Sequence, residues 1–294
     1  MATARSGEIV KREQTGEQQL VALVQKMGPE IARALPKTVT PDRMARIVLT
    51  ALRTVPKLAE CTPASFIGCV MSAAQLGLEP NTPLGEVYLI PRKNNRNGGR
   101  MECTMILGYQ GKMTLARRSG LVGAIWADVV RAGDHYQVKL GLHPDLVHEP
   151  SSDDDREQQP VVAAYACARV KGDDMPVFVA MSRAQIEGIR KRSSARDDGP
   201  WTTDYAEMAK KVAIARLYKV LPKSAEMARS DALDTADELG RDQSQAWDPS
   251  VSKALASAGL APELPPAHDS GPRAVPHDED GVVVDEAQRQ PGED

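Results

Sequence analysis

Three observations predict an α+β protein. Apolar residues recur at helical spacing through roughly the first 80 residues. Alternating apolar and polar runs separated by glycine turns follow between residues 86 and 181, and these predict strands. Helical patterns then return before the chain ends in an acidic, proline-rich stretch. The expected architecture is an N-terminal helical layer packed with a small antiparallel sheet and further helices.

The helical layer is predicted from its periodicity and its caps. Residues 17–35 carry an apolar stripe that Gly28-Pro29 should interrupt. Thr40-Pro41 and Thr62-Pro63 each supply an N-cap followed by proline at the first helical position, so two more helices begin there. The third of these helices should end at Gly77. We expect these amphipathic faces to form core.

A basic hairpin is predicted at the start of the sheet. Residues 86–91 and 101–107 form its strands, and Gly98-Gly99 favours a tight turn between them. The connecting stretch 92–100 carries four cations and no anion. Such a hairpin is typical of phosphate contact, and a solubilising loop tip is the alternative. Further strands are expected at 122–131, 135–140, 161–170 and 176–181.

The stretch 106–118, ILGYQGKMTLARR, joins a strand to a cationic helix through a turn containing Gly108 and Gly111. Its basic residues are Lys112, Arg117 and Arg118, and its aromatic is Tyr109. This pattern could hold a polyanion against a flat ring. The alternative is an ordinary strand-turn-helix with a solvated basic face, and we expect the two glycines to serve the turn.

Two later helices are also cationic. The first, capped by Ser182, ends near Lys191 and Arg192, and the second spans 205–221. The second helix contributes Lys210, Lys211 and Arg216. Trp201 follows a Gly-Pro turn between the two helices, where it either docks inward, the commoner outcome, or offers a stacking face.

The net charge of −3 hides an asymmetry between the body and the tail. Residues 1–225 carry 32 basic and 24 acidic side chains, whereas the rest of the chain carries 5 basic and 16 acidic ones. A basic body with an acidic tail is common in nucleic-acid proteins, and a solvated tail without such a role is the alternative. We expect a disordered N-terminus (1–16), a folded core (17–222) and a largely disordered tail (223–294) with one short helix near 226–239.

Several function classes are disfavoured. The chain has no apolar run of membrane-spanning length and no signal-peptide pattern, and its four cysteines lack CxxC spacing, so we expect a cytoplasmic protein with reduced core thiols. No P-loop, nucleophile elbow or zinc-protease motif occurs. The acidic run 153–155 lies in a stretch without regular structure, so a metal site there is not expected. These observations favour a binding protein over an enzyme.

Four blocks in order resemble the RecT family of phage single-strand annealing proteins: LGLEPNTPLGEVYLIP, ILGYQGKMTLARRSG, VVRAGD, and GPW followed by EMAKKVAIARLYKVLP. The resemblance covers about residues 17–222. It implies a DNA groove between helices and sheet, and ATP-independent annealing in phage recombination and repair within a bacterial host. It also implies oligomeric rings or filaments, a companion 5′–3′ exonuclease and a host single-strand binding protein as partners.

The residues expected to contact single-stranded DNA and the annealed duplex combine charge with position in these blocks. They are Arg92, Lys93, Arg96, Arg100, Tyr109, Lys112, Arg117, Arg118, Lys191, Arg192, Trp201, Lys210, Lys211 and Arg216. No catalytic residue and no cofactor are expected, with Mg²⁺ only as a modulator of annealing. The alternatives are a passive single-strand binding protein and, less favoured, a metal-dependent nuclease.

Overall fold

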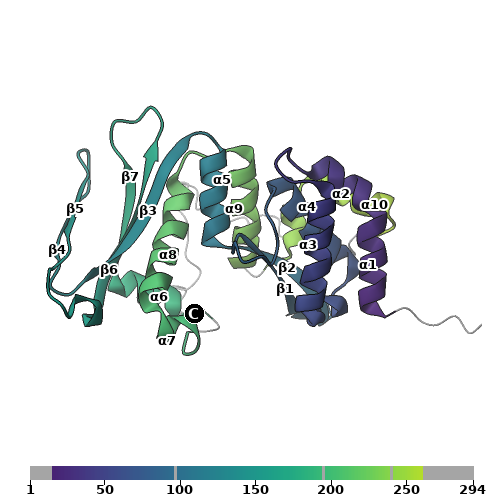
Figure 1. The fold of residues 1–294 in the computed structure, drawn as a ribbon, viewed down its shortest axis with the longest axis horizontal. Helices are drawn as coiled ribbons and strands as arrows, with labels where there is room; N and C mark the ends of the chain where they lie inside the picture. The colour runs from purple at the N-terminus through teal and green to yellow at the C-terminus, as the bar shows by residue number, and fades with distance from the viewer. Residues whose placement is uncertain (1–14, 96–97, 194–195, 239–240, 261–294) are drawn as a thin grey trace, which may run out of the picture. The chain divides into compact units, whose positions relative to one another are not determined.

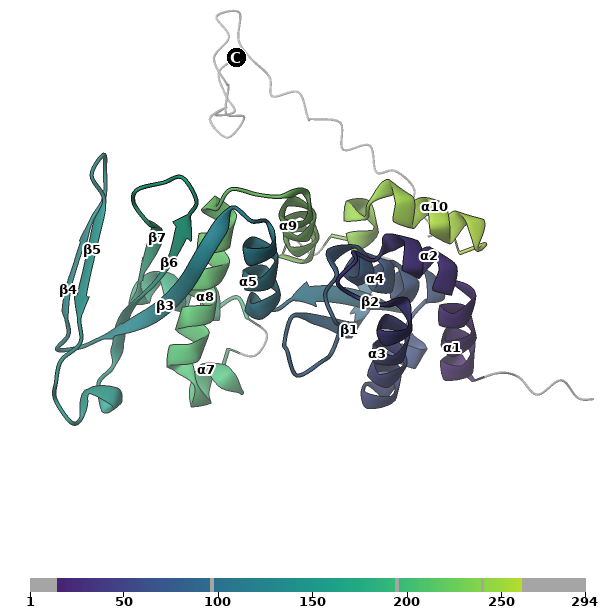
Figure 2. The same cartoon turned by 45° about the horizontal axis from the view of Figure 1, so that its top comes forward.

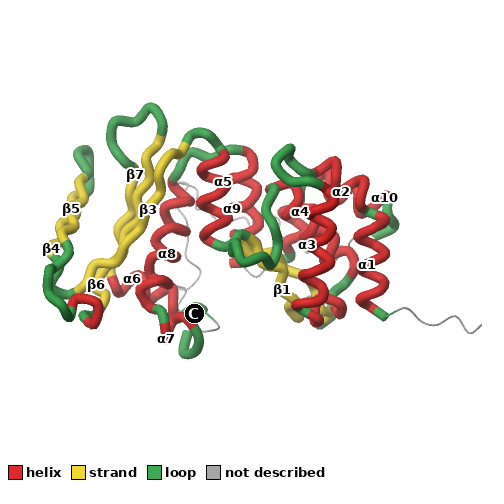
Figure 3. Tube along the Cα trace, in the orientation of Figure 1, coloured by secondary structure: helices red, strands yellow, loops and turns green. Residues whose placement is uncertain are grey.

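The computed structural model of the chain describes residues 15–95, 98–193, 196–238 and 241–260. The chain divides into two compact units, 1–262 and 263–294, and every described residue belongs to the first. The predicted disorder of residues 1–14 and 261–294 therefore concerns parts outside the described residues. Within them the expected α+β class is confirmed, with helices and small antiparallel sheets (Figures 1 and 3).

The N-terminal layer contains α1 (Gly16–Lys26), α2 (Gly28–Ala34), α3 (Pro41–Thr54), the short η1 (Pro56–Glu60) and α4 (Pro63–Leu76). The predicted caps are present, because the hydroxyls of Thr40 and Thr62 accept hydrogen bonds from the third residue of each helix. Helix α4 is the centre of this layer and is buried along most of its length. It ends at Gly77, whose left-handed conformation suits glycine.

The predicted hairpin is formed by β1 (Val87–Asn94) and β2 (Arg100–Leu107), which pair antiparallel from Val87 opposite Leu107 to Asn94 opposite Arg100. Alternate residues of β2, including Cys103 and Met105, are buried, and the strand packs on α4. Three of the hairpin's predicted cations thus belong to strands rather than to the turn. Helix α5 (Tyr109–Arg118) follows β2 directly.

A second sheet has the strand order β3 (Val122–Arg131), β6 (Val161–Val170), β7 (Val177–Ser182). Helix α8 (Tyr205–Val220) packs against it, with α6 (Arg183–Arg190) beside β6 and β7 and the short α7 (Pro200–Thr203) beside α8 (Figure 1). The opposite face meets a hairpin of β4 (His135–Lys139) and β5 (Asp145–Glu149), followed by η3 (Arg156–Gln158). The strand β5 was not predicted.

The folded core does not end at residue 222 as expected. It continues through α9 (Ala225–Glu238), η4 (Gln243–Ala246) and α10 (Pro249–Ser257), and α10 packs on α4 (Figure 2). The acidic composition of this segment predicted disorder, because its few large apolar side chains could not form a hydrophobic core by themselves. In the structure these side chains instead complete the core formed by the preceding residues. Those residues include Met227, Leu233, Val251 and Leu255, all at most 1% exposed.

Candidate nucleic-acid interface

The predicted DNA-contacting residues differ widely in accessibility. Most of the cations are exposed: Arg92, Lys93, Arg100, Arg117, Arg118, Lys191, Arg192, Lys211 and Arg216. Tyr109 and Lys210 are half-buried, whereas Lys112 and Trp201 are buried. Arg96 lies outside the described residues. The exposed group comes from β1, β2, α5, the end of α6 and α8, so several elements supply cations that could meet phosphate.

Lys112 was expected to contact DNA, but the residue is only 7% exposed. Its ammonium group forms an ion pair with Asp234 of α9 and lies 5.9 Å from the centre of the Tyr218 ring. Helix α9, which follows far along the chain, lies beside α5 in both ribbon views (Figures 1 and 2). In this conformation Lys112 therefore neutralises a carboxylate of the protein itself.

Lys211 brings a second cation close to Lys112. The residue is exposed, yet its ammonium group is partly desolvated; this desolvation and the repulsion from Lys112 both lower the pKa of Lys211. The neighbouring Lys210 instead pairs with Glu207 one turn earlier at 2.5 Å. Two lysine side chains thus lie near each other where α5 and α8 meet.

A row of aspartates on α9, Asp231, Asp234 and Asp237, was not singled out from the sequence. Asp237 pairs with Arg92 of β1 at 2.5 Å, and Asp231 pairs with Lys223, which precedes the helix. With the Lys112–Asp234 pair, this α9 aspartate row engages cations from three separate parts of the fold. The available signal was the spacing of the acids, three residues apart on one predicted helix.

Arg117 and Arg118 are both exposed but have different surroundings. The Arg118 guanidinium donates hydrogen bonds to the carbonyl oxygens of Leu76 and Gly77, at 3.2 and 2.9 Å, and so caps the C-terminal end of α4. Arg117 lies on the same last turn of α5. Arg118 therefore has a structural task that its charge alone did not reveal.

Neither of the two aromatic side chains predicted to stack on bases is fully exposed to solvent. Trp201 is 3% exposed and packs against Tyr205, with 6.0 Å between ring centroids, so it docks inward. Tyr109 is half-buried against the core, and its hydroxyl accepts a hydrogen bond from the Gln110 amide at 3.0 Å. Among the described residues the more exposed large aromatics are Tyr88 and Trp126, on β1 and β3. Outward alternation along a strand was the signal that could have found them.

Gly108 and Gly111, where β2 leads into α5, allow close packing of the backbone more than they shape the turn. Gly108 has φ of −70° and Gly111 lies within α5, so neither needs the left-handed region. A Cβ on Gly108 would lie 1.9 Å from the Gly85 carbonyl oxygen, and one on Gly111 would lie 2.3 Å from that of Glu86. The expectation that they matter chiefly for the turn is corrected: their missing side chains let α5 approach the start of β1.

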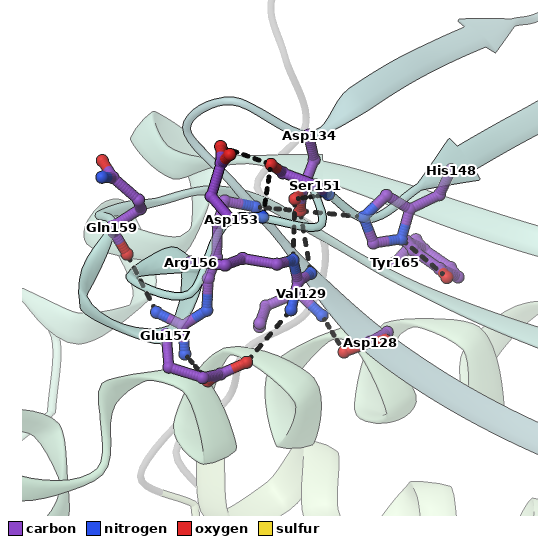
Figure 4. Close-up of polar contacts among 11 residues, drawn as sticks. Asp128, Val129, Asp134, His148, Ser151, Asp153, Arg156, Glu157, Gln159 and Tyr165 are labelled. Carbon is purple, nitrogen blue, oxygen red and sulfur yellow. Dashed lines mark hydrogen bonds and ion pairs between the residues drawn. The ribbon is translucent and has the colours of Figure 1, made fainter.

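A second polar cluster lies where the β4–β5 hairpin meets the larger sheet (Figure 4). The Asp134 carboxylate, with no exposed side-chain area, accepts hydrogen bonds from Arg156 at 2.7 and 2.9 Å and from His148 Nε2 at 3.0 Å. It also accepts hydrogen bonds from the backbone N–H groups of Arg131 and Ser151. Pairing with Arg156, followed by these other donors, holds the pKa of Asp134 far below its usual range although burial opposes the shift.

This Asp134 cluster contains an aspartate, a histidine and a tyrosine in hydrogen-bonding sequence, since the Tyr165 hydroxyl lies 3.1 Å from His148 Nδ1. The side chain of His148 is only 3% exposed, so a phosphodiester cannot reach it here. In the described part of the chain no three His, Cys, Asp or Glu side chains converge as a metal site would require. Nor is any helix there long and apolar enough to cross a membrane. The cluster acts as a clamp between the turn after β3, the hairpin and β6.

Comparison with known proteins shows the family of this chain. A family model described as the RecT family matches residues 42–250, which run from α3 into α10 and include α9. The chain is also 43% identical over 214 residues to "Protein RecT" of Escherichia coli strain K12, covering 72% of this chain and 78% of that protein. This chain therefore belongs to the RecT family.

Proposed function

We propose that this chain binds single-stranded DNA and anneals complementary strands without ATP, as an oligomer, during phage-type recombination. The observation that carries the proposal is the family match across residues 42–250, because single-strand annealing in recombination is what characterises the RecT family. The similarity to a protein named RecT over most of both chains supports it. Exposed cations on several elements are consistent with it.

The chemistry that annealing needs is non-covalent. Lysines and arginines on β1, β2, α5, α6 and α8 would hold phosphates and release the counterions bound to DNA, independently of sequence. Bases held on an extended strand remain free to test pairing with a second strand. Multiple copies along one strand would raise the local concentration of the partner strand. Base pairing then supplies the driving force, and no reacting side chain is required.

Two fluorescently labelled complementary oligonucleotides, mixed with the protein without ATP, test this function. We expect annealing well above the spontaneous rate across a range of salt and Mg²⁺ concentrations. Strand protection with slowed pairing would instead identify a passive single-strand binding protein. Cleavage of labelled DNA in Mg²⁺ or Mn²⁺, abolished by changing one Asp or Glu of the fold, would identify a nuclease.

A paired variant tests where the phosphates bind. Changing Lys210 and Lys211 to alanine should weaken binding and make the plot of log affinity against log salt shallower, by about 0.7 for each lost phosphate contact on a single strand. The matched control changes Lys57 and Lys253 to alanine, because both are exposed and neither belongs to the proposed interface. Equal slopes in the two variants would remove Lys210 and Lys211 from the interface.

The proposed annealing function also implies protein partners. We propose a 5′–3′ exonuclease that exposes single strands and a host single-strand binding protein as functional companions, with the acidic C-terminal stretch as the candidate contact. Co-purification of the full chain with each protein, against a chain ending at residue 260, checks this assignment. Loss of both contacts without residues 261–294 would support it, and retention of both would contradict it.

A further inference from the structure

The members of the α9 aspartate row are three residues apart on one helix, so each is turned by about 60° from the one before it. At about 1.5 Å rise per residue, their positions step by roughly 4.5 Å along the helix axis. Each carboxylate engages a different cation: Lys223 before α9, Lys112 on α5 and Arg92 on β1. Helix α9 thus presents three negative charges to cations that are far apart in the sequence.

Two of these three cations belong to the set proposed to bind DNA. Lys211, a third member of that set, lies close enough to Lys112 to lower its own pKa by repulsion. Two lysine ammonium groups therefore repel each other here, and a further anion between them would be favoured. A phosphate backbone offers the same cations the same kind of charge-assisted contact that the aspartates now supply.

Helix α9 is held by a narrow apolar face. Its buried positions include Met227, Leu233 and Ala236, together with Ser230, whose hydroxyl meets that of Tyr218 at 2.7 Å. By contrast, α4 buries ten of its fourteen residues. The three ion pairs consequently form a larger share of what holds α9, and ion pairs can be exchanged for others of similar chemistry.

We infer that α9 is an internal competitor for single-stranded DNA. Its aspartate row engages Arg92, Lys112 and Lys223 in the free protein, and the phosphates of a bound strand take over these cations as α9 releases them. This inference rests on the proposed function, because it needs the same cations to meet DNA. It explains why Lys112, which lies on the cationic helix after β2, is covered in this structure.

The decisive variant changes Asp231, Asp234 and Asp237 to asparagine. The matched control changes Asp153, Asp154 and Asp155 to asparagine, which alters the net charge equally at an exposed loop. Affinity for a labelled oligo-dT strand is measured by fluorescence anisotropy over a salt series. We expect the α9 variant to bind about 5- to 10-fold more tightly than the control, a coupling of ordinary size, with a steeper salt dependence.

Two further measurements guard against a folding defect. Asp237→Asn alone removes a pair whose arginine side chain is 47% exposed, so this variant should fold and still gain affinity, by a smaller factor. In the unaltered chain, hydrogen exchange of residues 225–238 should become faster when oligo-dT is added. Slower exchange of this helix on DNA would overturn the inference.

The outcomes separate the two proposals. If the unaltered chain and the control bind and anneal DNA while the α9 variants gain no affinity over the control, the competitor role is wrong and the annealing function stands. If neither the unaltered chain nor any variant binds single-stranded DNA, the proposed function fails, and the competitor role fails with it.

Discussion

The Asp134 cluster and the α9 aspartate row are both built from carboxylates and cations, but they are organised in opposite ways. In the first, side-chain and backbone donors from Arg131, His148, Ser151 and Arg156 converge on one carboxylate with no exposed area. In the second, three carboxylates engage three cations from separate parts of the chain, and Lys211 lies near one of these cations, Lys112. No single ligand could replace the five donors to Asp134, whereas the cations paired with α9 could bind another anion instead.

This difference indicates what each region does. A carboxylate with five donors is fixed by all of them, and its loss leaves several buried polar groups unsatisfied. The ion pairs of α9 can be replaced by phosphates, which satisfy the same cations. The Asp134 cluster therefore stabilises the β4–β5 hairpin, and the α9 row suits a surface that changes partner.

The largest effect is expected for Asp134→Asn. An amide cannot accept from all of these donors, and it leaves Arg156 without its main partner, so the free energy of unfolding should fall by about 3 kcal/mol. Urea denaturation measures this loss, and hydrogen exchange should place it at β4 and β5. Glu157→Gln is the control, because the Glu157 side chain is 75% exposed and its pairs should contribute under about 1 kcal/mol. Equal losses in both variants would refute the clamp.

A pH dependence follows from the same carboxylate. Its pKa in the folded protein is lowered, so Asp134 stabilises the fold above its unfolded pKa of about 3.9, and this contribution is lost as the pH falls below that value. The difference in unfolding free energy between the unaltered chain and Asp134→Asn should therefore be constant from pH 7 to 5 and shrink from about pH 4 downward. Urea titrations at pH 7, 5, 4 and 3 measure it, and a difference that stays constant throughout would count against the shift.

A smaller loss is expected for Lys112→Met. The side chain of Asp234 is 12% exposed, so it would lose its buried partner, but removing Lys112 also removes the repulsion between Lys112 and Lys211. We expect the free energy of unfolding to fall by about 1–2 kcal/mol, less than for Asp134→Asn. Urea denaturation of Lys112→Met, Asp234→Asn and the double variant gives the coupling between the two side chains. A loss as large as that at Asp134 would show that this pair is no more exchangeable than the clamp.

The smallest stability effect is expected for Asp237→Asn. Its pair with Arg92 is partly exposed, so its loss should cost under about 1 kcal/mol, and the cost should shrink further at high salt. Urea denaturation at 0.05 M and 0.5 M NaCl checks both statements. A large cost that salt does not reduce would assign Asp237 a buried structural role and would weaken the comparison with Asp134.

Much of the fold could be predicted from the sequence because its signals are local. Threonine caps followed by proline marked α3 and α4, and Gly98-Gly99 marked the turn between β1 and β2. The strand β5 was missed because it has no strong local pattern. Helix α10 was missed although Asp248 caps it and Pro249 occupies its first position, because the surrounding acidic, proline-rich composition indicated a disordered tail. Both are held by surfaces that other parts of the chain supply.

The sequence by itself determined which side chains carry positive charge and which elements bear them. Only the tertiary structure decided which of these charges are accessible. Lys112 is covered and neutralised by Asp234, Trp201 docks on Tyr205, and Arg118 caps α4, all through contacts that charge and local periodicity do not reveal. Burial and ion pairing depend on segments that become neighbours only on folding, so accessibility is a property of the assembled fold.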